Sequence, residues 1–355
     1  MSRVKLGDVA QEYKATVKDC SNLPIVGLEH LTPGEIALER WDEGTENTFT
    51  KGFKKGQMLF GRRRAYLKKA AVAPFDGVCS GDITVIEAIP GKILPELLPF
   101  IIQNDLLFDY AVGKSAGSLS PRVKWVDLKD YEFELPEIEK QASLVDLLKA
   151  AHATRKAYQE QIKATDDLVK SQFIEMFGDL TNNTKSLDLK PLSELLLIER
   201  GGSPRPIEKY ITDSEDGVNW IKIGDAEEGS IYITSTKEKI IKEGTKKSRY
   251  VQPGDFLLSN SMSFGRPYIL TIDGYIHDGW LVLRDQAGVF NKLFLHTLLS
   301  SDYAAASFEA MAAGSVVKNL NKELVGKLMV PVPPMELQNQ FASFIEQSDK
   351  SKFVV

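Results

Sequence analysis

The chain has 355 residues, of which 43% are hydrophobic and 26% charged, and its formal net charge is −5. This composition is typical of a globular protein, and the length allows two domains of ordinary size. No apolar run approaches the ~20 residues that cross a bilayer, and the N-terminus lacks the apolar stretch of a signal peptide, so we expect a cytoplasmic protein. The two cysteines, Cys20 and Cys79, form no CxxC motif and indicate neither a disulfide framework nor a zinc knuckle.

Residues 1–135 are predicted to form a first mixed α+β domain. Residues 76–91 place Val, Ile and Thr between clusters of Gly, Asp and Pro, which is the pattern of short strands and turns. The apolar stretch at residues 94–112 follows these strands and is expected to be helical. Strands followed by helices within one segment favour the α+β class.

A basic segment lies within this domain. Residues 51–69 hold eight basic side chains and no acidic one. In an acidic protein such a cluster is a candidate for neutralising DNA phosphates, and an arginine in it can also read guanine O6 and N7. The alternative is a solvated strand edge blunted by charge. The candidate DNA-binding residues are Lys51, Lys54, Lys55, Arg62, Arg63, Arg64, Lys68 and Lys69.

The loop after Gly117 offers further candidate contacts to DNA. Its sequence is SLSPRVK, in which Ser118, Arg122 and Lys124 are possible partners for phosphates or base edges. The competing interpretation is turn chemistry, in which Gly and Ser occupy their positions for backbone reasons alone. The sequence leaves both interpretations open.

Residues 136–178 are predicted to hold a long helix. Between Glu139 and Phe177 there is no Gly and no Pro, Pro136 precedes the start, and Gly178 ends the run. Apolar positions recur in alternating three- and four-residue steps, which is the spacing of a coiled coil. A helix of this length extends about 58 Å, which favours a rod over the alternative of an amphipathic helix lying on a globular core.

The second half of the chain repeats the first at a nearly constant spacing. Most matched positions differ by 197 residues, and the run RAYL at residues 64–67 is matched to RPYI at residues 266–269 with a shift of 202, which predicts a short insertion. A repeat this long indicates two whole domains in tandem, residues 179–332 forming the second, followed by a second helix at residues 333–355. The matched positions at 197 include residues 75–86 and 272–283, Gly117 and Gly314, Pro136 and Pro333, and Gln141 and Gln338.

The second domain has its own candidate DNA-binding residues. Residues 237–250 hold six basic and two acidic side chains, a weaker signal than in the first domain. The run SNSMSFGR at residues 259–266 is either a polar DNA loop or a plain connection, and the loop after Gly314 has the same two interpretations as its counterpart. The candidates are Lys246, Lys247, Arg249, Asn260, Arg266, Ser315, Lys318, Asn319 and Asn321.

The sequence has no recognisable catalytic or metal-binding motif. A GxxxxGK[ST] phosphate loop is absent, and VPVPPMEL lacks the polar residue before and the aromatic residue after Pro-Pro that an adenine methyltransferase tetrad has. The four histidines are scattered without an HExxH motif, and His277-Asp278 lacks a third partner, so that a satisfied turn is the favoured interpretation. We expect a non-catalytic chain with no metal and no cofactor of its own.

Each domain is closed by an AGS loop and followed by LPEIEKQ or VPPMELQ at the start of a helix. This ordered double occurrence resembles the specificity (S) subunit of type I restriction-modification systems. The resemblance covers essentially the whole chain apart from the shortened last helix, and no single motif carries it. It implies two tandem pseudo-repeated target recognition domains separated by long helices that form an antiparallel coiled coil.

The resemblance also implies a function and partners. The chain would read a bipartite double-stranded DNA target, one half per domain, and scaffold two modification (methyltransferase) subunits, with restriction subunits joining for cleavage. S-adenosylmethionine and adenine methylation would then belong to the modification subunit. An approximate twofold relation between the halves suits two copies of that partner.

Antiparallel pairing of the helices has a further consequence. The start of the short second helix would lie beside the end of the first, and the half of the first helix nearest the first domain would lack an intramolecular partner. An exposed apolar seam of this kind predicts self-association or cover by a modification subunit. The expected pairing residues are Leu144, Leu148, Ala151, Tyr158, Ile162, Val169, Met176, Phe341, Phe344 and Ile345.

Two other classes of function stay open at this point. One is a tandem-repeat protein-interaction scaffold whose basic loops bind no specific DNA sequence, and the other is an enzyme with a nonstandard site. Salt-sensitive, sequence-selective DNA binding together with methyltransferase subunits separates recognition from scaffolding. Methylation by the purified chain alone would support the enzyme.

Overall fold

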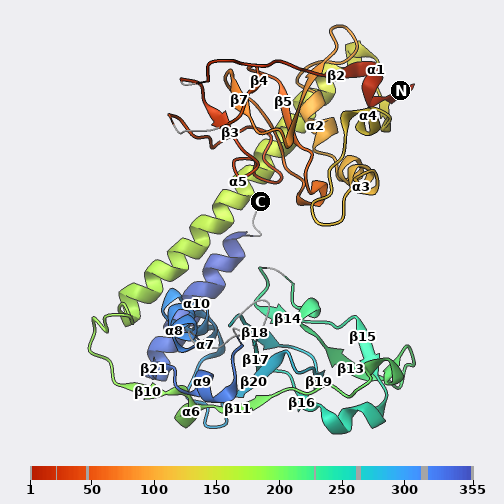
Figure 1. Cartoon of the computed structure of the whole chain (residues 1–355). Helices are drawn as coiled ribbons and strands as arrows, with labels where there is room; N and C mark the ends of the chain where they lie inside the picture. Colours follow the sequence, from red (N-terminus) through yellow and green to blue (C-terminus); the bar gives the residue numbers. More distant parts are fainter. Residues whose placement is uncertain are drawn as a thin grey trace. The chain divides into compact units, whose positions relative to one another are not determined.

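The structure is a computed structural model of the chain that describes residues 2–20, 22–44, 48–227, 229–260, 265–312 and 319–352. It divides into two compact units, Met1–Ala157 and Tyr158–Val355, and the division falls within one continuous helix, α5 (Ile138–Phe177). Figure 1 shows this helix and the strands of each unit. Among the described helices, none combines the length and the apolar character needed to cross a membrane.

The first unit holds a four-stranded sheet in the order β2-β8-β5-β6, a three-stranded sheet in the order β3-β7-β4, and the pair β1-β9. All pairs are antiparallel except β3 and β7. The strands are β1 (Ser2–Lys5), β2 (Ala10–Glu12), β3 (Ile25–Val26), β4 (Lys51–Phe53), β5 (Met58–Gly61), β6 (Ala70–Val72), β7 (Gly77–Cys79), β8 (Ile83–Ala88) and β9 (Glu132–Leu135). The helices before α5 are α1 (Leu6–Val9), η1 (Ala65–Leu67), α2 (Leu98–Ile102), α3 (Asp105–Gly113) and α4 (Trp125–Leu128).

The second unit holds two five-stranded sheets, in the orders β11-β20-β17-β18-β14 and β12-β15-β13-β19-β16, and the pair β10-β21. The strands are β10 (Leu189–Pro191), β11 (Leu197–Arg200), β12 (Ile211–Thr212), β13 (Val218–Ile221), β14 (Tyr232–Ile233), β15 (Glu238–Ile240), β16 (Arg249–Val251), β17 (Phe256–Ser259), β18 (Pro267–Leu270), β19 (Gly274–Ile276), β20 (Trp280–Arg284) and β21 (Met329–Pro331). The helices are α6 (Leu192–Leu195), η2 (Ile207–Lys209), η3 (Ile223–Asp225), η4 (Lys242–Lys247), α7 (Lys292–Leu299), α8 (Asp302–Ala312), α9 (Lys322–Gly326) and α10 (Met335–Lys352).

Each sheet of the first unit recurs in the second. The order β2-β8-β5-β6 recurs as β11-β20-β17-β18, and β3-β7-β4 recurs as β13-β19-β16 with its parallel pair retained. The register also agrees: Met58 pairs with Ile86, and Phe256, 198 residues after Met58, pairs with Leu283, 197 residues after Ile86. The duplication predicted from the sequence is therefore present in the backbone. Strands β12, β14 and β15 are additions of the second unit.

One match made from the sequence is wrong. Strands β6 and β18 occupy the same place in the register, so that Ala70 corresponds to Pro267. Arg266 therefore corresponds to Lys69 and not to Arg64, and the shift at this point is 197 residues. The expected insertion is absent, because the RAYL run forms η1 in the loop between β5 and β6 and does not correspond to RPYI.

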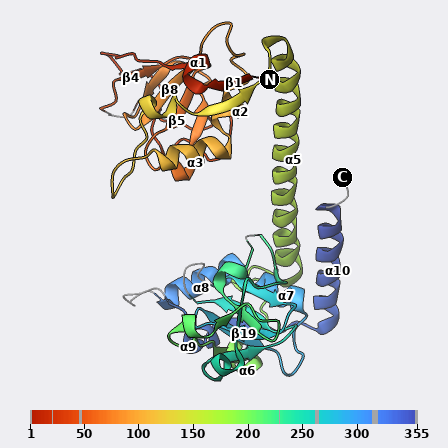
Figure 2. The same ribbon diagram turned by 90° about the vertical axis from the view of Figure 1, so that its right-hand side faces the viewer.

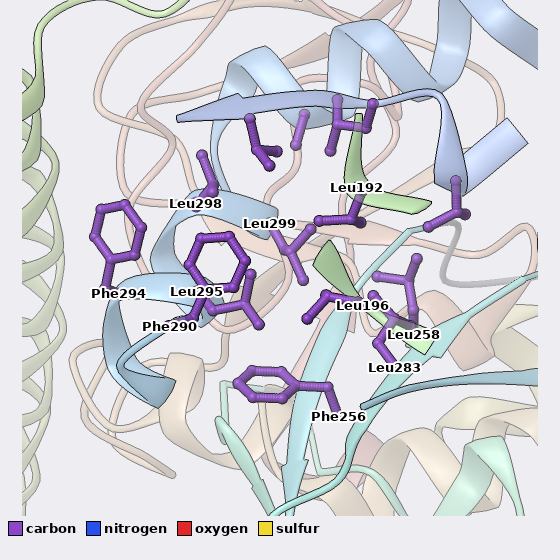
Figure 3. Close-up of a cluster of buried hydrophobic side chains, with 14 of the residues drawn as sticks. Leu192, Leu196, Phe256, Leu258, Leu283, Phe290, Phe294, Leu295, Leu298 and Leu299 are labelled. Carbon is purple, nitrogen blue, oxygen red and sulfur yellow. The ribbon is translucent and has the colours of Figure 1, made fainter. Parts of the chain in front are cut away.

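The central strands of both units are buried on both faces. In β5, Met58 and Phe60 face a core formed with α2, α3 and the start of α5, whereas Leu59 faces a second core formed with β3, β4 and β7. In the second unit, Figure 3 shows Phe256 and Leu258 of β17 in the core that they share with α7. Successive side chains of a strand point to opposite faces, and burial on both faces explains why these strands read as continuous apolar runs.

Each unit is closed by pairing its own first and last strands. Strand β1 pairs with β9, with Ser2 opposite Leu135, and β10 pairs with β21, with Leu189 opposite Pro331. The last strand in each case leads directly into a long helix, α5 or α10. A unit and its helix are therefore joined where the unit is closed.

A buried glutamine fixes the start of each long helix to its unit. The Gln141 side chain accepts a hydrogen bond from the Leu94 amide at 2.8 Å and donates to the carbonyl of the proline five residues before it at 3.0 Å. Gln338 accepts from the Asn291 amide at 2.8 Å and donates to the proline carbonyl five residues before it at 2.8 Å. These glutamines are 1% and 0% exposed. Buried main-chain groups require such partners, which explains why this position is the same in both copies.

The start of α10 packs against the end of α5 in antiparallel orientation. The Phe341 ring lies 5.5 Å from the rings of both Phe173 and Phe177, measured between centroids. Ile345, one turn later on α10, lines a cavity with Val169, two turns before the end of α5. Figures 1 and 2 show the two helices side by side over this stretch. The expected antiparallel pairing is confirmed here.

The residues that make this contact differ in part from those expected. Phe341 and Ile345 are buried in the same core as Phe173 and Phe177, with Val169 and Met176 packed against it. Phe344 is half-buried and is not part of that core, and Ile162 is exposed. Phe173 and Phe177 are not among the expected pairing residues, because the helix also packs against α7 and its contact face is broader than a coiled-coil seam.

The expectation of an unpaired seam at Leu144 and Leu148 is wrong. Both side chains pack against the core of the first unit, and their neighbour Val145 is buried in it. Farther along the helix, Arg155 donates to the Gly34 carbonyl at 2.5 Å. Of Leu144, Leu148 and Ala151 only Ala151 is exposed, so Leu144 and Leu148 do not form the apolar seam expected on this half of the helix.

Replacing the buried amide of α10 tests its structural role. We expect Gln338→Leu to lower the free energy of unfolding by about 2–4 kcal/mol, because it leaves the Asn291 amide and buried carbonyl groups without partners. Denaturant unfolding of the full chain measures the loss. Gln347→Leu, a matched change at an exposed position of the same helix, should have little effect. Equal effects of the two changes would contradict the role assigned to Gln338.

A histidine on α7 makes stability depend on pH. Burial lowers the pKa of His296 from 6.5 to about 4, against the opposing effect of a hydrogen bond with the Pro267 backbone. Between pH 4 and pH 6.5, His296 is therefore protonated in the unfolded chain and neutral in the folded chain. The contribution of neutral His296 to the free energy of unfolding is therefore fully present above pH 6.5, and it is lost as the pH falls toward 4.

We expect thermal or denaturant unfolding at pH 5.5 to show a loss of about 1 kcal/mol from this histidine, relative to pH 7.5. His296→Gln should reduce that pH dependence, because glutamine does not titrate. If the variant loses as much stability on acidification as the parent chain, the assignment of the effect to His296 is wrong.

Candidate nucleic-acid interface

Three segments of the first unit meet at the end of strand β5. The Arg62 amide donates to the Asp82 carbonyl at 2.9 Å, and the Arg62 carbonyl accepts from the Val123 amide at 2.9 Å. The Arg64 amide donates to the Pro121 carbonyl at 2.8 Å. The loop that follows β5, the turn that precedes β8 and the loop that precedes α4 therefore form one surface, which we call the arginine cluster. It contains Arg62, Arg63, Arg64, Ser118, Ser120, Arg122, Lys124 and Asp82.

A single carboxylate organises two of these arginines. Arg122 binds Asp82 through two parallel hydrogen bonds, Nε to Oδ1 at 2.7 Å and Nη2 to Oδ2 at 3.2 Å. Arg63 donates from Nη1 to Asp82 Oδ2 at 3.4 Å and from Nε to the Ser120 hydroxyl at 2.8 Å. The hydrogen bond from Arg122 holds the pKa of the Asp82 carboxyl group below its usual value, so the group stays ionised. The fork of Arg122 is thereby held in one orientation.

The other basic residues of the cluster are less constrained. Among the described residues, Arg62 and Arg64 form no ion pair, and Arg64 is exposed with a left-handed backbone (φ 54°). Lys124 is exposed at the start of α4, and Ser118 is exposed in the preceding loop. The cluster holds four arginines and one lysine against one carboxylate, so this surface is positively charged in an otherwise acidic chain.

The basic segment predicted from the sequence does not form one surface. Lys54 and Lys55 lie in the turn before β5, whereas Arg62 to Arg64 follow its end. Lys54 pairs with Asp76 at 2.8 Å, and the Lys55 amide binds the same carboxylate. The three other lysines have partners within the fold: Lys51 donates to the Ile83 carbonyl, Lys68 pairs with Asp105, and Lys69 donates to the Leu28 carbonyl.

The second unit repeats the backbone links of the cluster with different side chains. The Asn260 amide donates to the Gly279 carbonyl at 3.0 Å, and the Asn260 carbonyl accepts from Leu320 at 2.9 Å. Asn260 is 1% exposed, and its side chain donates to the Asp278 carbonyl at 2.7 Å. Position 260 thus holds a loop together here, as a turn residue and not as an accessible base contact.

The other candidates of the second unit lie in several settings. Asn321 caps α9 by accepting from the Leu324 amide at 2.8 Å, which favours the turn interpretation. Arg266 is exposed, Arg249 pairs with Glu199 at 3.1 Å, and Lys246 and Lys247 end η4. The Asn319 side-chain oxygen is buried without a hydrogen-bond partner in the described part of the chain. Ser315 and Lys318 lie outside the described residues.

A hollow of about 670 Å³ in the second unit was not found from the sequence. Ser203, Arg205 and Asp278 lie on its wall, where Asp278 accepts from the Ser203 hydroxyl at 2.7 Å and pairs with Arg205 at 3.2 Å. Nothing in the sequence signalled it, because residues 203 and 278 are 75 positions apart. Asp82 was also missed, because an acidic residue lowers the local density of positive charge by which the DNA-binding candidates were chosen.

The structure supports the turn interpretation of His277. Its side-chain Nε2 accepts from the Ile223 amide at 3.1 Å, and burial lowers the pKa of the imidazole. The neutral ring is thus a hydrogen-bond partner of the main chain. Within the residues that the structure describes, no group of three or more His, Cys, Asp or Glu side chains could hold a metal ion.

Comparisons with known proteins agree with this architecture. Residues 187–353 match the family described as type I restriction modification DNA specificity domain. The chain is 25% identical over 193 residues to the type I restriction enzyme EcoDI specificity subunit of Escherichia coli, covering 52% of this chain and 38% of that protein. It is 21% identical over 357 residues to the putative type I restriction enzyme MjaX specificity subunit of Methanocaldococcus jannaschii, covering 94% of this chain and 81% of that protein.

A solved structure shows the same fold. The crystal structure of the type I restriction-modification system S subunit from M. genitalium is 12% identical, covers 99% of this chain and 90% of that chain, and superposes with a TM-score of 0.55. The likeness in fold extends over both repeated units. The chain is therefore similar to type I restriction-modification specificity subunits, by the family match over residues 187–353 and by the second relative over 94% of its length.

Proposed function

We propose that this chain is the DNA sequence-recognition subunit of a type I restriction-modification complex and that its two units read the two halves of a bipartite target. The observation that carries the proposal is the arginine cluster on a duplicated unit. The backbone that holds the cluster recurs in the second unit with Asn260 and Asn319 in place of Arg62 and Arg122. One scaffold with different side chains at the same loops suits two units that read different bases.

The charge of the cluster supports binding to duplex DNA. Exposed Arg64 and Lys124 suit phosphate contacts, which release counterions and supply most of the affinity. Arginine forks suit guanine in the major groove.

The partners follow from the same proposal. Two modification subunits would bind S-adenosylmethionine and methylate adenine, restriction subunits would join for cleavage, and this chain would supply recognition without catalysis, in the cytoplasm. Exposed apolar side chains on α5 support docking of partner subunits. They include Leu147, Ile162, Leu168 and Ile174.

Removing the unpaired arginines tests the electrostatic part of the proposal. We expect the double change Arg62→Ala, Arg64→Ala to weaken DNA binding and to lower the slope of log affinity against log salt by up to about 1.8, about 0.9 for each lost phosphate contact. Fluorescence anisotropy at several salt concentrations measures both. The matched control is Lys54→Ala, Lys55→Ala at the other end of β5, which removes the same charge. Equal slopes for both variants would show that net charge, and not this surface, determines binding.

The recognition role itself is tested in the cell. Deleting the gene should abolish adenine methylation at a split sequence motif, and restoring the chain should restore it, as read by genome-wide mapping of methylated adenines. A methylation pattern that does not depend on the chain would refute the proposed function and favour an interaction scaffold.

A further inference from the structure

We propose that Arg122 reads a guanine in one half of the DNA target and that Asp82 is the residue that positions it. This inference rests on the proposed DNA-recognition function. Beyond that function, it assigns the recognition of one base to one side chain and the orientation of that side chain to one carboxylate.

The hydrogen bonds of Arg122 leave one specific edge of its guanidinium group for a ligand. Asp82 occupies the side of the fork formed by Nε and Nη2, at 2.7 and 3.2 Å. The Ser120 carbonyl accepts from Nη1 at 3.4 Å. A guanidinium group has five N–H donors in one plane, so two remain, one on Nη1 and one on Nη2. The Arg122 side chain is 40% exposed, and that of Asp82 only 20%.

The remaining donor pair matches guanine better than any other base. In the major groove guanine presents two acceptors side by side, O6 and N7, whereas adenine presents one acceptor and one donor. A planar donor pair therefore binds guanine through two hydrogen bonds and meets a repelling donor on adenine. A lysine, which has no fork, cannot reproduce this selectivity.

Asp82 is itself held in place before any ligand binds. Its amide donates to the Ser80 hydroxyl at 3.2 Å, and its carbonyl accepts from Arg62 at 2.9 Å. Arg63 shares its carboxylate, with Nη1 at 3.4 Å from Oδ2. The Arg122 side chain is thus ordered in the free protein, so that less conformational entropy is lost when it binds.

The second unit lacks this pair. The positions of Asp82 and Arg122 correspond to Gly279 and Asn319, which follow them by 197 residues. Any change of selectivity caused by the pair is therefore expected in one half of the target and not in the other.

The test compares binding-site selection by the full chain and its variants from a pool of random duplexes. We expect Arg122→Lys to lower the preference for guanine at one position of one half-site by roughly 5- to 150-fold, and the other positions to be unchanged. Asp82→Asn should relax the same position, and the double variant should add little, because Asp82 acts through Arg122. The matched control is Asp76→Asn, which makes the same charge change at a carboxylate that pairs with Lys54. Circular dichroism and thermal unfolding verify that each variant is folded.

Other outcomes refute the inference in distinguishable ways. A parent chain that selects no sequence, alone or together with its modification subunits, refutes the proposed function, and the inference with it. A selective parent chain whose preferences survive both Arg122→Lys and Asp82→Asn refutes the inference alone. Arg122→Gln is the second variant, and if it weakens all sequences equally while lowering the salt slope by about 0.9, Arg122 binds a phosphate and does not read a base.

Discussion

The buried amide group at the start of each long helix is the contact on which the rest of the architecture depends. Gln141 and Gln338 each join the helix to a main-chain amide of their own unit and to the proline carbonyl before the helix. Water does not reach these groups, so a helix that turned about its axis would leave several polar atoms unpaired, at about 1–3 kcal/mol each. A unit and the first turns of its helix therefore behave as one body, and the direction in which the helix leaves is a property of the unit.

Much of the fold could be predicted from the sequence because the residues that match between the two copies have structural roles. Glycine, proline and glutamine anchors kept their spacing, and the strands between them kept their register. The match of Arg64 with Arg266 was wrong because RAYL and RPYI are similar in sequence but lie in different elements. RAYL forms the loop helix η1 in the first unit, and RPYI lies at strand β18 in the second. The heptad pattern likewise missed Phe173 and Phe177, because sequence spacing alone does not show that a third helix packs there.

The candidate site was predictable in composition and not in arrangement. Basic density pointed to Arg62, Arg63 and Arg64, and a separate loop pointed to Arg122. The meeting of Arg63 and Arg122 at one carboxylate depends on contacts 19 and 40 residues apart in the sequence. For the asparagines of the second unit, the residue type suggested a DNA contact that their hydrogen bonds within the fold do not favour. Asn260 and Asn321 have side chains suited to bases, yet each is used to hold its own loop or helix start.

The pairing of first and last strands within each unit has a consequence for how such chains can change. Because β1 pairs with β9, and β10 with β21, no strand pair has to be broken when one unit is cut out at its two ends and another inserted. One end of each unit lies in the strand that precedes the long helix. The glutamine at the start of that helix can form the same hydrogen bonds with any unit that offers the same main-chain groups. Genetic recombination at these two ends would exchange a whole unit in one event and leave the hydrophobic core of the other unit unchanged.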